Sequence, residues 1–487
     1  MTRLHIRDSR ARAALRLLAL SALVATSVAL PSAPAAAAGP PNVVVVLIDD
    51  ARMDDVDTMP LTRSLIGDAG ATFENSYAPF PLCCPSRATL LTGQYAHNHG
   101  VLDNVAPLGG FAAFDDSQTL ATWLDEDYAT GYVGKYLNEY QPARYVPPGW
   151  DTWKAALAPI HYLDTDVSVN GKIRSFEGQY RTNVMANMAV QFIRTETADP
   201  SEPFFLFTSF DAPHSGRPVE PDDPNKIYDT QEFPTPGVLG KYRDRFDDLP
   251  LDVGPAFNEA DVSDKPVQLA PLEPWEIDAL TEVNQQRREA LLSVDDAVRR
   301  MVDELARAGE LDNTYLIFTS DNGYMLGEHR FRTGKNLPYE PSVAVPLLIR
   351  GPGIAPGTVV PQTVGGHDVA PTVLGMTGLS GASGDFVIDG LDLLPLIDDP
   401  ALHARRPVVL EVGPNPTAPE GPYRFHAIRT PEWKYVERST GRTELYDVAG
   451  DPYELENLSR APEYDQIRAD LAVLLKEYRF CAGSDCW

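Results

Sequence analysis

The sequence predicts an α/β fold in which helices cover a large, mostly parallel sheet and a smaller antiparallel sheet follows it. Residues 42–50, NVVVVLIDD, form a run of β-branched side chains without polar alternation, which is typical of a strand buried on both faces. Residues 314–323, TYLIFTSDNG, repeat this pattern. After residue 395, short segments such as FHAIRTPEWKYVE alternate with tight turns, which favours antiparallel strands.

A helix is expected immediately before the second buried strand. Residues 293–310 place apolar side chains at helical spacing, with Ser293 as a suitable N-cap and Gly309 as a suitable stop. Because helix and strand alternate, the sheet should be largely parallel. Further strands are expected at 129–133, 204–208 and 345–349, and further helices at 60–68, 86–91, 117–126 and 183–196.

Two parts of the chain depart from this alternation. Residues 214–275 are rich in Pro, Asp and Gly and lack periodicity, which is typical of a functional or mobile loop. Near the C-terminus, a last helix is expected at 464–478 because its leucines share one face. The chain is longer than one hydrophobic core usually allows, so we expect a large domain at 42–395 and a smaller one at 396–487.

The first 38 residues have the features of a secretory signal peptide. An arginine-bearing start precedes an apolar run at 15–30 and an alanine-rich end. No later segment approaches the roughly 20 continuous apolar residues that a membrane-spanning helix needs. We therefore expect a protein without a membrane span that is secreted or extracytoplasmic after cleavage near Ala38.

The chain is strongly acidic. Its formal charge is −28, and residues 1–38 carry five arginines and one aspartate, so the remainder has a charge of about −32. This charge makes nucleic acid an improbable partner. Any site for an anion must therefore be a local basic pocket or contain a bound cation.

Polar side chains end both buried strands. Asp49 and Asp50 close the first strand, and Asp321 and Asn322 close the second. If the strands are neighbours in the sheet, these oxygens converge at its carboxyl edge, where ligands bind in open α/β sheets. Three carboxylates so close together would repel one another unless a cation lay between them, and oxygen ligands favour Ca²⁺. The simpler interpretation is that both sequences are only turns.

Four cysteines are present, and three pairings of them are possible. Cys481 and Cys486 are five residues apart in a loop-like tail, so a local disulfide is the economical choice. Cys83 and Cys84 then remain unpaired. Because Pro85 suits a first helical turn, Cys83 should lie at a helix N-terminus with Arg87 one turn further along, an arrangement that binds anions.

Residues 83–93, CCPSRATLLTG, match the pattern C-x-P-S-R-x4-T-G and resemble the sulfatase family, in which the first cysteine is converted to formylglycine. GKYLNEY, APHS and PLLIRGPGI also resemble the family, and the similarity extends over about residues 42–480. The chain is most similar to the N-acetylglucosamine-6-sulfatase branch. The resemblance implies an alkaline-phosphatase-like α/β/α sandwich with a smaller C-terminal antiparallel sheet packed with a helix.

The resemblance also implies the chemistry. A sulfuric ester hydrolase is expected, which acts through formylglycine at position 83 and through Ca²⁺ held by residue 83, Asp49, Asp50, Asp321 and Asn322. Asp321 would accept a proton, and His214 or Lys335 would protonate the leaving oxygen. Developing charge would be stabilised by Arg87, Lys135 and Lys335, while substrate would contact Asn104, Lys135, His214 and Lys335. A formylglycine-generating enzyme is the implied partner for maturation.

One position departs from the family pattern. Many sulfatases have a histidine where this chain has Leu137, so the base for sulfate release is open, with His97 or His99 as substitutes. Ordinary structural roles also remain open: Lys135 and Lys335 as surface lysines, His214 as a loop histidine, and Asn104 as a turn residue. Cys84 is expected to be an inert buried thiol.

The expected substrate is a sulfated small molecule or oligosaccharide, with 6-O-sulfated N-acetylglucosamine or a related sugar first among them, as in glycosaminoglycan degradation. The acidic surface favours a short oligosaccharide over a densely sulfated polymer. A phosphodiesterase or phosphonate monoester hydrolase of the same superfamily is the first alternative. A calcium-dependent binder of sulfated glycans is the second, if Cys83 is never oxidised.

Overall fold

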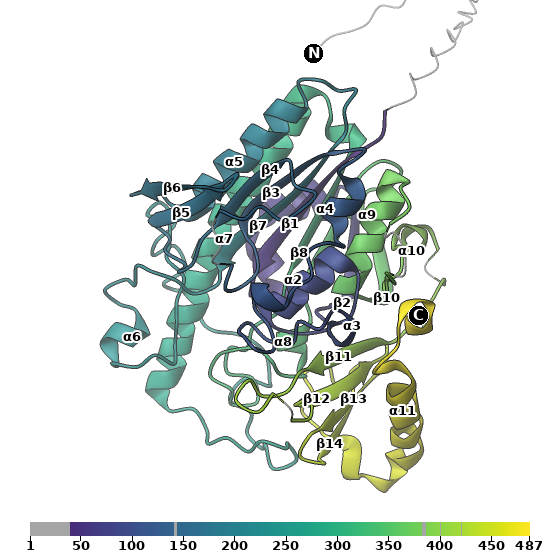
Figure 1. Ribbon diagram of the computed structural model, residues 1–487. Coiled ribbons are helices and arrows are strands. Elements are labelled where there is room, and N and C mark those ends of the chain that lie inside the picture. Colours follow the sequence, from purple (N-terminus) through teal and green to yellow (C-terminus); the bar gives the residue numbers. More distant parts are fainter. Residues whose placement is uncertain (1–38, 141–143, 382–385, 400, 420) are drawn as a thin grey trace, which may run out of the picture. The chain divides into compact units, whose positions relative to one another are not determined.

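The computed structural model describes residues 39–140, 144–381, 386–399, 401–419 and 421–487 (Figure 1). The signal peptide expected at 1–38 lies outside these residues. Within the described ranges, no helix combines the length and the apolar character that crossing a membrane requires.

A sheet of ten strands forms the centre of the molecule, with the order β10-β2-β9-β8-β1-β7-β3-β4-β5-β6. Strand β1 pairs in parallel with β7 and β8, whereas the antiparallel pairs involve β9 or β5. The predicted large, mostly parallel sheet is therefore confirmed. The strands are β1 Asn42–Asp49, β2 Ala71–Tyr77, β3 Ala129–Lys135, β4 Thr152–Ala156, β5 Asp164–Val169, β6 Lys172–Glu177, β7 Phe204–Pro213, β8 Thr314–Ser320, β9 Leu347–Arg350 and β10 Thr358–Gly365.

Helices cover both faces of this sheet, which gives the expected three layers (Figure 1). Alternate residues of β1 enter two different apolar clusters, Val43 on one face and Val44 on the other, because the strand is buried on both sides. One face is covered by α5 Arg181–Glu196 and α7 Pro274–Ala308. The other is covered by α2 Cys83–Thr92, α4 Leu120–Leu124 and α9 Val369–Thr377. The remaining helices are α1 Pro60–Thr62, α3 Ala96–His99, α6 Pro224–Ile227, α8 Glu340–Val343, α10 Leu394–Asp398 and α11 Asp465–Tyr478.

Helix α7 is longer than the sequence indicated. It begins at Pro274, after a capping box formed by Glu273 and Glu276, so the N-cap predicted at Ser293 is wrong and Ser293 lies buried within the helix. Buried polar residues such as Arg287 interrupt the apolar pattern upstream and conceal this first half. The predicted stop is confirmed, because Gly309 takes a left-handed conformation with φ of 82°.

A second sheet of four antiparallel strands follows, in the order β11-β12-β13-β14, and confirms the predicted small sheet. Leu471 and Leu475 of α11 are buried against it. Cys481 and Cys486 form a disulfide beyond this helix. The domain boundary at 395/396 stays a prediction. The strands are β11 Val408–Val412, β12 Phe425–Arg429, β13 Trp433–Arg438 and β14 Thr443–Asp447.

Buried ion pairs join the small sheet to the first residue of α8. Lys434 on β13 is fully buried, with its ammonium 2.9 Å from Glu340 and 2.5 Å from Glu454. Arg429 on β12 lies 3.0 Å from Glu340. Burial by itself would raise the pKa of Glu340, but Arg429 and Lys434 lower it to about 2.

Glu340→Gln is expected to lower the stability of the protein in a pH-dependent way. The pKa of Glu340 is lower in the folded chain than the unfolded value of about 4.3, so its contribution is present above pH 4.3 and is lost as pH falls toward 2. The free energy of unfolding should therefore differ most from wild type at pH 7, and the difference should shrink steadily as pH falls from 4.3 toward 2. Glu463→Gln, at an exposed position, should show no such pH-dependent difference. A Glu340→Gln deficit that stays constant from pH 7 to pH 3 would refute this account.

Candidate active site

Cys83 is the first residue of α2, as the sequence predicted. Leu82 before it is extended, Pro85 lies in the first turn, and Gly93 ends the helix with φ of 70°. Asn104 accepts a hydrogen bond from the Cys84 backbone N–H at 2.8 Å, so its side-chain carbonyl caps this helix. The Cys83 side chain is 1% exposed and lies at the positive end of the helix dipole.

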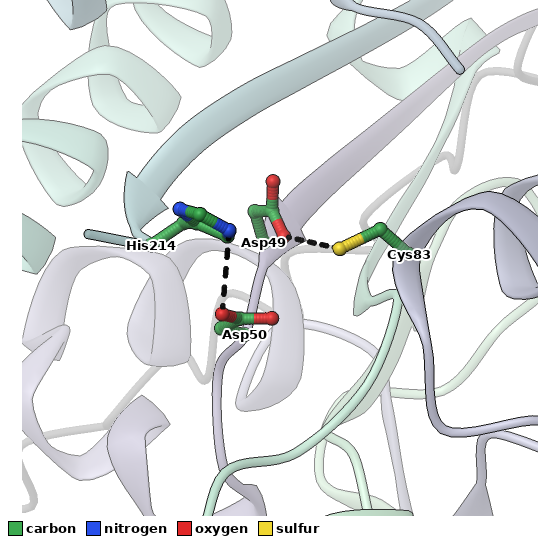
Figure 2. Close-up of side chains that lie close together, drawn as sticks. All are labelled: Asp49, Asp50, Cys83 and His214. Carbon is green, nitrogen blue, oxygen red and sulfur yellow. Dashed lines mark hydrogen bonds and ion pairs between the residues drawn. The ribbon is translucent and has the colours of Figure 1, made fainter. Parts of the chain in front are cut away.

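Asp49, Asp50, Cys83 and His214 come together in front of this helix terminus (Figure 2). One potential ligand atom from each lies within 4.8 Å of those of the others, so the group has the geometry to hold a metal ion. The Cys83 Sγ is 3.5 Å from Asp49 Oδ1, and His214 Nε2 is 3.8 Å from Asp50 Oδ2. The carboxyl ends of β1 and β7 and the start of α2 therefore meet at one point.

The second strand end reaches the same point, because β8 is the direct neighbour of β1. Asp321 Oδ1 accepts a hydrogen bond from the Asp50 backbone N–H at 3.1 Å, and Asn322 Nδ2 donates to Asp50 Oδ1 at 2.7 Å. Asn322 Oδ1 is buried and has no hydrogen-bond partner among the described residues. An unsatisfied buried amide oxygen on a residue that contacts Asp50 fits a ligand of a hard cation such as Ca²⁺.

Three cationic side chains surround these carboxylates. The Arg87 Nε donates to Asp321 Oδ2 at 2.8 Å, and its Nη2 is 3.4 Å from Asp49 Oδ2. Lys135 forms an ion pair with Asp49 and Lys335 with Asp50. The Lys335 Nζ also lies 2.9 Å from the Cys83 Sγ. Neither lysine is a solvated surface residue, since their side chains are only 10% and 13% exposed.

The pKa of Asp49 is lowered in this cluster, whereas the pKa values of Asp321 and Cys83 are raised. Burial would raise the pKa of Asp49, but Lys135, His214, Arg87 and Lys335 together hold it well below its usual value. The pKa of Asp321 is instead raised to about 6 by burial and by the charge of Asp49. Burial and Asp49 also raise the pKa of the Cys83 thiol to about 11. An unmodified Cys83 would thus remain a thiol, which is a poor nucleophile.

His97 and His99 do not reach this cluster with a free ring nitrogen. The two nitrogens of His97 bond Glu411 and the carbonyl of Cys481, each at 3.0 Å. His99 bonds Thr89 Oγ1 at 3.0 Å and accepts the Val101 N–H at 3.1 Å. Leu137 and Cys84 are buried apolar side chains within the core. Because their ring nitrogens are engaged elsewhere, neither His97 nor His99 is positioned to act as the base for sulfate release.

Two supporting residues were not found from the sequence. Arg287 of α7 is 2% exposed and donates to the Asp50 carbonyl at 2.7 Å, and Ser209 of β7 accepts from Arg87 Nη1 at 2.7 Å. In the sequence, the one sign of Arg287 was a charged residue within the apolar periodicity of a helix. Arg287 and Ser209 are distant in sequence from the residues they contact, so only the tertiary fold brings them to the site.

Comparisons with known proteins agree with this geometry. The family profile for sulfatases matches residues 41–379, and a profile for the C-terminal part of N-sulphoglucosamine sulphohydrolase matches residues 327–480. The N-acetylglucosamine-6-sulfatase of Capra hircus is 30% identical over 92% of this chain and 84% of its own length. The extracellular sulfatase SULF-1 homolog of Drosophila melanogaster is 35% identical over 73% of this chain, which spans only 31% of that protein.

A solved structure also shows the fold. It is that of a protein in complex with its substrate D-glucosamine-2-N,6-O-disulfate, and it superposes with a TM-score of 0.71 at 24% identity, covering 90% of this chain and 97% of that one. The sulfatase profile spans more than half of the chain and includes every residue of the cluster around Cys83. This chain belongs to the sulfatase family.

Proposed function

We propose that this chain is a calcium-dependent sulfatase that releases sulfate from a sugar sulfate ester, first of all a 6-O-sulfated N-acetylglucosamine or a related sugar. The observation that carries the proposal is the position of the Cys83 Sγ, 3.5 Å from Asp49 Oδ1 and 2.9 Å from the Lys335 Nζ. The position expected to become formylglycine thus lies between a metal-binding carboxylate and a cation suited to an anionic ester.

The cation site is assigned to Asp49, Asp50, Asp321 and Asn322, which offer oxygen ligands from two adjacent strand ends. Calcium bound there, together with formylglycine at position 83, would supply an oxygen nucleophile at neutral pH. By the family resemblance Asp321 would accept its proton, and this carboxylate is fully buried beside the proposed cation site. Arg87 holds this carboxylate in place through its Nε.

The remaining side chains act on the ester. Lys135 and Lys335 flank position 83 and would bind the sulfuryl oxygens, whose negative charge they neutralise. His214 follows β7 and lies near Asp49, Asp50 and Cys83, and either His214 or Lys335 would protonate the leaving oxygen. Asn104 stays a proposed substrate contact, with its carbonyl already engaged by the helix N-terminus.

The proposed substrate follows the names of the relatives together with the charge of this chain. An enzyme with a formal charge of about −32 after loss of residues 1–38 suits a short oligosaccharide better than a densely sulfated polymer. Export through a cleaved signal peptide and maturation by a formylglycine-generating enzyme complete the proposal.

The test combines mass spectrometry with a substrate screen. The tryptic peptide containing residue 83 should be about 18 Da lighter than its cysteine form. The purified protein should release sulfate from glucosamine 6-sulfate faster than from choline sulfate, and a chelator should abolish turnover until Ca²⁺ is restored. Faster hydrolysis of phosphate diesters or phosphonates than of any sulfate ester would overturn the proposal. A purely cysteine form that binds sulfated glycan without turnover would instead identify a binding protein.

A further inference from the structure

Two aromatic side chains are exposed together on the segment that the sequence predicted as a loop. Tyr228, just after α6, is 37% exposed and Trp275, in the first turn of α7, is 36% exposed. Their ring centroids lie 5.0 Å apart. Phe233 is fully buried and supports the Trp275 ring edge-on at 5.7 Å. We call Tyr228 and Trp275 the aromatic ledge.

The ledge is connected to the candidate active site by two separate routes. The loop that carries Tyr228 is closed at its base by a hydrogen bond from the Gly216 N–H to the Thr235 carbonyl at 3.0 Å, two residues after His214. Thr333 Oγ1 donates to the Glu232 carbonyl at 3.0 Å, two residues before Lys335. The segment that carries Tyr228 is therefore tied to the chain within two residues of His214 and within two residues of Lys335.

Charged groups form the rim of the ledge. Arg332 is 39% exposed in its side chain and forms ion pairs with Glu276 and, at 3.6 Å, with Glu232. Exposed apolar patches with a polar rim mark ligand-binding or partner-binding surfaces. A sugar ring offers apolar C–H faces to an aromatic ring and hydroxyl groups to charged neighbours. Because two carboxylates, Glu232 and Glu276, share the single guanidinium of Arg332, the rim has a net negative charge and favours an uncharged ring over a sulfated one.

We propose that the aromatic ledge is a subsite for an uncharged sugar unit of an oligosaccharide whose sulfated unit lies at Cys83. The inference rests on the proposed function, since it places the substrate ester beside His214 and Lys335. It identifies the preferred substrate as an oligosaccharide with at least one unsulfated unit beyond the reacting one. The ring stacks on Trp275 while Arg332 and Glu232 bond its hydroxyl groups.

The experiment compares the variant Tyr228→Leu/Trp275→Leu with wild type on three substrates. For a mono-6-sulfated N-acetylglucosamine oligosaccharide, KM should rise about 3- to 10-fold with unchanged kcat, because stacking on an aromatic pair contributes about 0.5–1.5 kcal/mol. For N-acetylglucosamine 6-sulfate and for 4-nitrophenyl sulfate, both constants should stay unchanged. Trp275→Tyr should restore most of the oligosaccharide affinity, and Phe480→Leu, at an aromatic side chain that is 62% exposed on the C-terminal segment, should change nothing.

A binding measurement keeps this inference separate from the proposed function. Unsulfated tri-N-acetylglucosamine should change the tryptophan fluorescence of wild type and not that of Trp275→Leu, whether or not the protein hydrolyses sulfate esters. Equal losses on all three substrates would mean that the ledge only supports the Lys335 segment and would overturn the inference. Unchanged oligosaccharide kinetics, or a ledge variant that differs from wild type in oligomeric state, would also overturn it. Absence of turnover on every sulfate ester would refute the proposed function alone, because the fluorescence result still decides the subsite.

Discussion

Arg87→Met is expected to destabilise the protein by about 3–5 kcal/mol and to lower kcat by at least about 10²-fold. Arg87 is 2% exposed and lies between Asp321, at 2.8 Å, and Asp49, at 3.4 Å. Methionine fills a similar volume but leaves both carboxylates without this partner in a buried place. The loss arises from uncompensated buried charge, so saturating Ca²⁺ should recover part of the stability and little of the activity.

The matched control is Arg63→Met. Arg63 pairs with Asp57 at 3.1 Å, but both side chains are exposed, 58% and 66%, and such surface pairs contribute about 0–1 kcal/mol. Thermal and urea unfolding of both variants, with and without Ca²⁺, measures the difference. Similar losses of stability in the two variants would contradict the assignment of Arg87 to a buried charge cluster.

The position of the candidate site could be predicted from the sequence because each of its parts is marked by a short local motif. An apolar run that ends in Asp49 and Asp50 predicts a buried strand with ligands at its carboxyl end, and the same holds for Asp321 and Asn322. The helix start at Cys83 follows from Pro85 and Gly93. The adjacency of β1 and β8 was an assumption, since 264 residues lie between Asp49 and Thr314 and no local signal specifies their pairing.

The contacts that hold the site in place could not be predicted from the sequence, because they join side chains that are far apart in the chain. Arg287 reaches Asp50 across 237 positions, and His97 reaches Glu411 across 314. A lone charged residue in a helix is usually solvated, so nothing in the sequence indicated that Arg287 is buried. Tertiary pairing reverses this preference, because burial is tolerated once each charge has a partner.

The contacts of the two residues proposed as donors to the leaving oxygen, Lys335 and His214, could not be predicted from the sequence either. Lys335 and His214 belong to segments without periodicity, and only the structure shows how differently they are held. The Lys335 Nζ lies 2.9 Å from the Cys83 Sγ, the position proposed for the nucleophile. His214 has its Nδ1 2.7 Å from the Ser215 carbonyl and its Nε2 3.8 Å from Asp50 Oδ2. One nitrogen of His214 is therefore occupied, and the other faces the carboxylate of Asp50, which is proposed to bind the metal.

Two variants, Lys335→Met and His214→Ala, are expected to distinguish charge stabilisation of the sulfuryl group from protonation of the leaving oxygen. The comparison uses two substrates whose leaving groups differ in their need for a proton. Lys335→Met should lower kcat about 10²- to 10³-fold on sugar and aryl sulfates alike, because it removes charge stabilisation of the sulfuryl group, which both substrates share. His214→Ala should lower kcat about 10²-fold on a sugar sulfate, whose alkoxide needs a proton, and less than about 10-fold on 4-nitrophenyl sulfate, whose phenolate leaves without one. Lys172→Met, at an exposed lysine of β6, serves as the control for loss of a positive charge.

For each variant, the loss of kcat on the sugar sulfate is divided by the loss of kcat on 4-nitrophenyl sulfate. This ratio shows which of the two side chains protonates the leaving oxygen. A large ratio for Lys335→Met and a ratio near one for His214→Ala would exchange the assignments and make the lysine the proton donor. Ratios near one for both would mean that neither side chain protonates the leaving oxygen and that both bind the sulfuryl group. Because the Lys335 Nζ lies 2.9 Å from the Cys83 Sγ and His214 Nε2 faces Asp50, we expect charge stabilisation and proton transfer to be carried out by different segments of the chain.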